Sequence, residues 1–122
     1  MRPRLCRYLA PVASLAAQRR WMVQGTPGEY LLPSELLEDA AEAVRLVCGT
    51  PGAANDLSLD AVRAILDLRA CIDAAGHALE GGASEEELVE RDGAWHLLRE
   101  QAIRCLETLT FDLRAWETSL RL

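Results

Sequence analysis

Apolar residues recur every three or four positions along most of the chain, which is the spacing of one face of an α-helix. Glycine and proline interrupt this pattern at 25–28 and 49–52, and a pair of glycines interrupts it at 81–82. The pattern therefore predicts four helices, at about residues 5–24, 34–48, 59–80 and 85–120. Because short connections favour antiparallel neighbours, the expected fold is all-α: one domain, an antiparallel four-helix bundle with a long C-terminal helix.

The last predicted helix has a clear start and two uncertain points. Ser84 and Glu87 form a capping box, and three consecutive glutamates occupy the first turn, where the helix dipole favours negative charge. Asp92-Gly93 is a weak point inside a helix, and residues 109–113 alternate apolar and polar side chains as a strand does. We favour a helix at the second point because a lone strand would have no partner.

The predicted C-terminal helix is longer than its neighbours. At 1.5 Å per residue an unbroken helix over 85–120 would span about 54 Å, against roughly 33 Å for the 59–80 helix. A monomer rarely exposes a large apolar patch, so we expect the excess either to be covered by the first helix or to bind a protein partner or a second copy of the chain. The predicted partner-binding residues on this excess are Phe111, Leu113, Trp116 and Leu120.

Composition narrows the class of protein. Half of the residues are hydrophobic, but no long uncharged apolar run occurs, so we expect no transmembrane helix. All thirteen basic residues are arginine, which excludes chemistry that needs a lysine, such as a Schiff base or a P-loop. We interpret the absence of lysine as a sign of a GC-rich coding sequence, from a bacterium or a phage.

Charge is unevenly distributed along the chain. Residues 1–28 carry five arginines and no acid, whereas residues 29–122 carry eight arginines and nineteen acids, which gives the net charge of −6. An acidic body disfavours nonspecific nucleic-acid binding. The N-terminal segment is the exception, since it could contact nucleic acid or another acidic surface through Arg2, Arg4, Arg7, Arg19 and Arg20. The 34–48 helix has an acidic outer face, which we interpret as solvated, at Glu35, Glu38, Asp39 and Glu42.

Cysteine and histidine give no sign of a metal centre. The four cysteines lie more than twenty residues apart, so there is no C-x-x-C motif for zinc or redox chemistry. We expect them to be reduced and mostly buried, in a cytoplasmic protein. The chain has only two histidines and neither an E-x-x-H nor an H-x-x-x-H spacing, so we expect no metal and no cofactor.

One short motif suggests an enzymatic alternative. Arg91 and His96 stand at the ends of the stretch RDGAWH. This R-x4-H spacing resembles the motif of HEPN-type ribonucleases, small helical bundles that are often dimeric. The resemblance implies that Arg91 and His96 line an RNA-cleaving cleft without a metal, with Asp92 as the polar residue that commonly follows the arginine. Leu98 stands where that family often has tyrosine. The alternative is a surface histidine, with Arg91 paired to Glu87 one helical turn earlier.

A second short stretch has a structural explanation. Ser58, within DLSLDAVR, is slightly similar to the serine that carries phosphopantetheine in acyl and peptidyl carrier proteins. Those proteins usually have aspartate or histidine directly before the serine, and this chain has Leu57. Helix capping therefore explains Ser58 better.

The sequence contains no grouping that identifies a catalytic centre. We therefore expect a non-enzymatic protein-binding domain: a small regulator, an inhibitor or immunity-type protein, or a helical small subunit of a larger bacterial or phage complex. The alternatives are a HEPN-like ribonuclease and a helical subunit of a nucleoprotein complex that contacts nucleic acid through its basic N-terminal helix.

Overall fold

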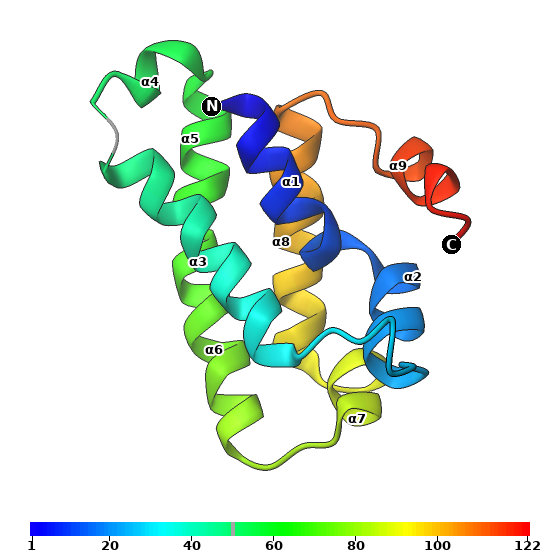
Figure 1. Ribbon diagram of the computed structural model, residues 1–122. Helices are drawn as coiled ribbons and strands as arrows, with labels where there is room; N and C mark the ends of the chain where they lie inside the picture. Colours follow the sequence, from blue (N-terminus) through cyan, green and yellow to red (C-terminus); the bar gives the residue numbers. More distant parts are fainter. Residues whose placement is uncertain (50) are drawn as a thin grey trace.

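Helices account for most of the chain (Figure 1). The computed structural model describes residues 1–49 and 51–122. In chain order the helices are α1 (Arg2–Ala13), α2 (Leu15–Gln18), the π-helix η1 (Arg19–Val23), α3 (Pro33–Gly49), α4 (Ala53–Asp56), α5 (Leu59–Leu66), α6 (Leu68–Glu80), α7 (Glu85–Glu90), α8 (Gly93–Thr108) and α9 (Leu113–Ser119). Within the described residues there is no strand, only an isolated β-bridge between Thr26 and Glu29. The all-α prediction is confirmed.

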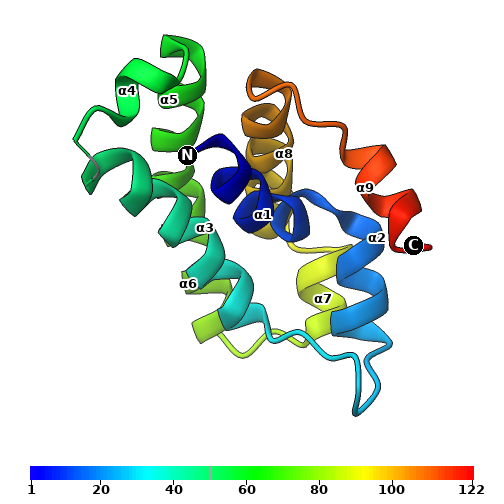
Figure 2. The ribbon, with the colours of Figure 1, turned by 45° about the horizontal axis from the view of Figure 1, so that its top comes forward.

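The hydrophobic core lies among α1, α3, α5, α6 and α8. Helix α8 packs against α1 and also against α5 and α6, and α3 contacts α1 and α6 (Figure 2). Leucine and aromatic side chains fill the centre, while alanines on α3, α6 and α8 allow the helices to approach closely. The side chains that are almost fully buried include Leu5, Leu9, Leu36, Ala40, Ile65, Leu68, Ala75, Trp95, Leu98 and Ala102.

The first predicted helix, 5–24, is wrong as a single element because the chain breaks at Ser14. This residue has an extended backbone (φ −93°, ψ 106°), and its Oγ accepts a hydrogen bond from the backbone N–H that follows three residues later, at 3.0 Å. Ser14 therefore caps α2, a role for which serine is favoured. Pro11 weakens the end of α1, since it has no N–H to donate. The side-chain amide of Gln18 donates to the carbonyl oxygens of Pro11 (3.1 Å) and Val12 (2.8 Å). These carbonyls lie in the last turn of α1, where the helix supplies no backbone N–H donor for them.

The two middle helices follow the sequence pattern closely. The predicted 34–48 helix is α3, which begins one residue earlier at Pro33, a residue favoured in the first turn. The predicted 59–80 helix is α5 followed by α6, with the single residue Asp67 between them. The turn predicted at 49–52 lies partly outside the described residues.

The continuous helix predicted at 85–120 is wrong, because the chain divides there into α7, α8 and α9. At the first break, Asp92 has an extended backbone, and its Oδ1 accepts a hydrogen bond from the N–H of Trp95 at 2.8 Å. Asp92 therefore caps α8 instead of lying inside a helix. Gly93 favours the same break, since glycine is a poor helix former.

The second break is the end of α8, which forms a Schellman motif. The N–H of Phe111 donates to the carbonyl oxygen of Leu106 at 3.0 Å. Thr110 lies between them with a φ of 52°, in the left-handed region where glycine is usual. Asp112 then caps α9 by accepting a backbone hydrogen bond at 2.9 Å. The helix that we favoured over 109–113 is therefore wrong: most of this stretch is a turn, and α9 begins only at its last residue.

Helix α9 returns along the N-terminal part of the molecule instead of extending beyond the core. Figures 1 and 2 both show it on the side that carries α1 and α2, away from α3 and α6. None of its residues is fully buried. Its apolar side chains therefore face a space that α1 and η1 only partly fill.

Candidate partner-binding groove

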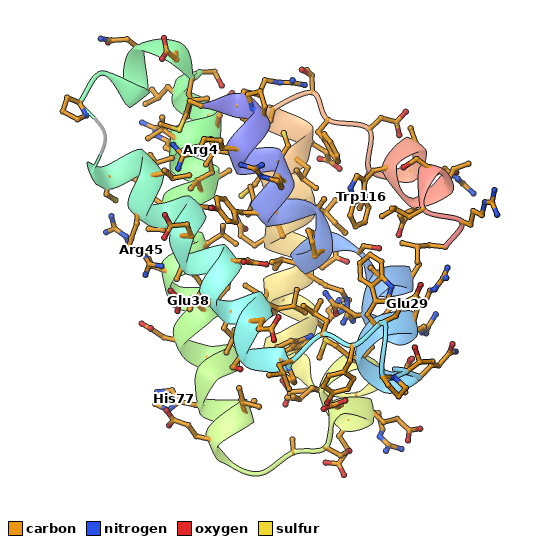
Figure 3. All side chains as sticks on the ribbon, viewed as in Figure 1. Arg4, Glu29, Glu38, Arg45, His77 and Trp116 are labelled. Atoms are coloured by element: carbon orange, nitrogen blue, oxygen red, sulfur yellow. The ribbon has the colours of Figure 1, made fainter. Side chains whose placement is uncertain are left out.

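A groove of about 610 Å³ lies between α9 and the N-terminal helices. This volume is typical of binding sites, which span roughly 300–1,000 Å³. Figure 3 shows Trp116 in the space between α9 and these helices. The residues that line the groove are mostly apolar: Arg2, Pro3, Cys6, Arg7, Pro11, Trp21, Phe111, Trp116 and Leu120.

The groove brings together three of the four predicted partner-binding residues. Phe111, Trp116 and Leu120 line it, whereas Leu113 lies outside the lining and packs against the edge of the core. The first helix partly covers these side chains, which is one of the two arrangements that the sequence suggested. Leu120 is still 39% exposed.

Polar contacts fix one side of the groove. Arg2 donates from Nε to the carbonyl oxygen of Leu109 at 2.6 Å and from Nη2 to that of Thr110 at 3.1 Å. These carbonyls end α8, so the guanidinium satisfies groups that have no helical donor. Farther along, the hydroxyl of Ser14 donates to a carboxylate oxygen of Glu117 at 2.5 Å. The break after α1 is therefore attached to the C-terminal part of the chain, and the turn after α8 is attached to the N-terminal part.

The other end of the groove is closed by η1 and the residues that follow α9. Arg20 donates from Nη1 to the carbonyl oxygens of Leu120 (3.4 Å) and Arg121 (3.2 Å). Trp21 and Trp116 pack edge to face, with ring centroids 6.3 Å apart and planes at 89°. Trp21 was not among the predicted site residues, because its aromatic partner lies at the far end of the sequence.

The N-terminal arginines do not form one free basic surface. Besides the two that bind backbone carbonyls, Arg19 forms a bidentate pair with Glu90, with nitrogen–oxygen distances of 2.6 and 2.8 Å. This hydrogen bonding lowers the pKa of Glu90. Arg4 and Arg7 are exposed and have no ion pair among the described residues, and the Arg7 guanidinium carbon lies 5.9 Å from the centre of the Tyr8 ring. A nucleic-acid contact through all five arginines stays a prediction, and it would have to replace contacts that three of them already make.

One arginine on α3 pairs with two acids of the acidic face of that helix. Arg45 lies 2.5 Å from a carboxylate oxygen of Glu38 and 2.8 Å from one of Glu42. Asp39 is half-buried, and its pKa is raised, mainly by burial and also by the negative charges of Glu35 and Glu38. Glu35 is exposed in the first turn, where the helix dipole favours an acid.

Arg91 lines a pocket that does not include His96. Arg91 follows the last residue of α7 and lines a pocket of about 310 Å³ with Ala83, Glu87 and Asp92. His96 lies in the first turn of α8, is exposed, and is not part of that lining. The predicted Arg91–Glu87 ion pair is also not among the ion pairs of the described residues. The ribonuclease hypothesis stays a prediction, and the pocket lined by Arg91 does not support it.

The remaining candidate side chains have structural roles or form no cluster. Ser58 accepts a hydrogen bond from the N–H of Ala61 at 3.1 Å and caps α5. All four cysteines are free thiols, and burial raises the pKa of Cys105 to about 12. Across residues 1–49 and 51–122 no group of three or more histidine, cysteine or acidic side chains could hold a metal ion. No helix in the described part of the chain is both long enough and apolar enough to span a bilayer.

A buried polar network lies beside the groove, and nothing in the sequence pattern indicated it. Gln18 is 1% exposed, and its Oε1 accepts hydrogen bonds from Trp95 Nε1 (3.1 Å) and Arg99 Nη1 (3.0 Å). Arg99 is 7% exposed and has no ion pair among the described residues, and burial lowers the pKa of its guanidinium. The network ties the N-terminal break to the centre of α8.

Known proteins add no identity to this geometry. Comparison of the chain with protein-family models, with curated proteins and with solved structures finds no match.

Proposed function

We propose that this chain is a non-enzymatic protein-binding domain that accepts apolar side chains of a partner in the groove between α1 and α9. The observation that carries the proposal is the group of half-buried aromatic side chains there, Trp21, Phe111 and Trp116. The few residues that dominate the binding energy of protein interfaces are enriched in tryptophan, tyrosine and arginine, and they cluster near the centre of the interface. A partner that covers them would remove apolar surface from water.

The chemistry of the groove supports binding more than catalysis. Among the described lining residues, the only ionisable side chains are two arginines and Cys6. Burial raises the pKa of Cys6, so its nucleophilic thiolate is disfavoured. No histidine or carboxylate among the described lining residues could act as a general base.

The expected biological role is that of a small regulator, an inhibitor or immunity-type protein, or a small subunit of a bacterial or phage complex. Four free thiols fit a reducing cytoplasm. A net charge of −6 keeps a small protein soluble and favours partners with a positive surface. A second copy of the chain is the simplest other partner.

The test is a pair of aspartate substitutions on the same short helix. Trp116→Asp places a charge in the groove, whereas Thr118→Asp places the same charge about 200° around α9, on an exposed position. Wild type and both variants are expressed at native level in the host, and their partners are identified by affinity purification and mass spectrometry. Circular dichroism checks that each variant stays helical.

The expected result is one stoichiometric partner that wild type and Thr118→Asp retain and Trp116→Asp loses. Retention by the folded Trp116→Asp variant would contradict the use of the groove. Recovery of the chain alone, with a monomeric mass in sedimentation, would contradict protein binding. Assays of RNA cleavage by wild type and His96→Ala would then come next.

A further inference from the structure

The groove between α1 and α9 has a one-sided electrostatic character. Both charged side chains in its lining, Arg2 and Arg7, are positive, and no acid is among the described lining residues. Residues 29–122 are strongly acidic, so this positive edge contrasts with the rest of the molecule. A ligand with negative charge at that edge is therefore favoured over a neutral or cationic one.

Both arginines have N–H donors that an anion could accept, and the guanidinium of Arg2 is already held in place. The guanidinium of Arg2 is fixed by the carbonyl oxygens of Leu109 and Thr110, which use two of its five N–H donors. Arg7 is exposed and has no competing carboxylate among the described residues. A planar guanidinium that is already oriented loses little entropy when it binds a carboxylate.

The remaining lining fits an apolar body. The rings of Trp21, Phe111 and Trp116 and the side chain of Leu120 form an apolar wall opposite the two prolines of α1. The volume of about 610 Å³ lies within the range of small-molecule sites, roughly 300–1,000 Å³. Apolar walls with a few fixed polar groups are the usual form of a small-molecule site.

We propose that the groove binds a small amphipathic anion, a free molecule with an apolar body and one carboxylate, whose charged end meets Arg7 and Arg2 and whose body lies against Trp21 and Trp116. This inference goes beyond the proposed function, because it concerns the isolated chain and requires no protein partner. A partner that uses the same groove would compete with this ligand.

The test is calorimetric titration of the purified chain with decanoate, and with decyltrimethylammonium as the probe of equal length and opposite charge. The variants are Arg7→Gln, and Arg63→Gln as a control at an exposed arginine on α5 that does not line the groove. Emission from Trp21 and Trp116 reports entry into the groove, since both rings line it. Vesicles with anionic lipid form a separate arm.

The expected result is saturable binding of one decanoate per chain, with affinity for the cation at least tenfold weaker. Arg7→Gln should weaken decanoate binding about tenfold, which corresponds to about 1.4 kcal/mol, and Arg63→Gln should leave it unchanged. Absence of saturable decanoate binding, equal binding of the cation, or an unaltered affinity in Arg7→Gln would each overturn the proposal. Binding to anionic vesicles without binding of free decanoate would overturn it as well, and would indicate a lipid surface.

Discussion

Replacing Gln18 by leucine should destabilise the protein by about 4 kcal/mol. The side-chain amide has two donors and two acceptor sites, and all four are used: it donates to the carbonyl oxygens of Pro11 and Val12 and accepts from Trp95 and Arg99. A buried hydrogen bond contributes about 1 kcal/mol, so four lost bonds account for this total. The gain from burying a leucine is small, because Gln18 already fills the site at 1% exposure.

A control substitution at a second glutamine separates the loss of the hydrogen-bond network from the general effect of replacing a glutamine by leucine. Gln101 makes a single side-chain hydrogen bond, from Nε2 to the carbonyl oxygen of Ala64 at 2.9 Å. Gln101→Leu should therefore cost about 1 kcal/mol or less. The assay is urea denaturation followed by circular dichroism, with the free energy of unfolding extrapolated to water. If Gln18→Leu costs no more than Gln101→Leu, the proposed contribution of the network is refuted.

The buried guanidinium of Arg99 provides a second test of the contribution of the Gln18 network. In Gln18→Leu the charge of Arg99 loses its only side-chain acceptor among the described residues, and an uncompensated buried charge is strongly destabilising. Arg99→Met removes that charge and should cost much less than Gln18→Leu. The double variant should then be more stable than the sum of the two single effects predicts, by about 1 kcal/mol or more. Simple additivity would show that the two side chains are not coupled.

Three smaller predictions follow from the titratable groups. Asp39→Asn should raise the free energy of unfolding at pH 7 by about 0.5 kcal/mol, the scale of like-charge repulsion on a helix. The folded-state pKa of Asp39 is raised, so in denaturation experiments the gain in stability should be absent at low pH and should grow as pH rises from the ordinary value of 3.8 through the raised pKa. Arg19→Gln should destabilise the protein at pH 7, because it removes the partner of Glu90. The folded-state pKa of Glu90 is lowered, so the difference in stability between wild type and Arg19→Gln should be fully present above pH 4.5, the ordinary pKa of the glutamate, and should be lost as the pH falls through the lowered pKa. A thiol reagent at pH 8 should modify exposed Cys48 rapidly and Cys105, buried with a pKa of about 12, only after unfolding, as mass spectrometry of the labelled chain will show.

Local signals in the sequence predicted most of the helical structure. Apolar spacing located α3 within one residue at each end, and Ser58 and Ser84 cap α5 and α7 as their side chains suggested. These features depend on neighbours within a few positions. Short-range chemistry therefore settles them before tertiary packing is known.

The breaks at Ser14 and Thr110 could not be predicted because they depend on distant or unusual contacts, whereas the break at Asp92 is a local cap at a point that the sequence already marked as weak. Ser14 lies within an apolar stripe, and the carbonyls exposed by its break are satisfied by Gln18, a residue that a sequence pattern assigns to the surface. Thr110 is β-branched, and such residues rarely adopt a positive φ, so the alternating pattern at 109–113 marked this stretch as uncertain without indicating a turn at Thr110.

The groove could not be predicted from the sequence either, because it too depends on contacts between distant residues. The sequence singled out the apolar residues of 109–120 as a group that would need to be covered, but the direction in which they lie depends on the turn at Thr110. The pairing of Trp21 with Trp116 joins opposite ends of the sequence. The two rings meet only when that turn has formed.

Helix α9 has no fully buried residue and contacts chiefly the N-terminal segment. Its local unfolding would therefore expose little of the core, and the free energy of that opening is a small part of the global value. Amide hydrogens of α9 should therefore exchange with solvent through this local opening, whereas exchange in α8 should require much of the core to unfold. We therefore expect α9 to exchange between a closed and a detached position, and a ligand that binds only the closed state should favour that state by RT ln(1 + L/Kd), where L is the concentration of free ligand.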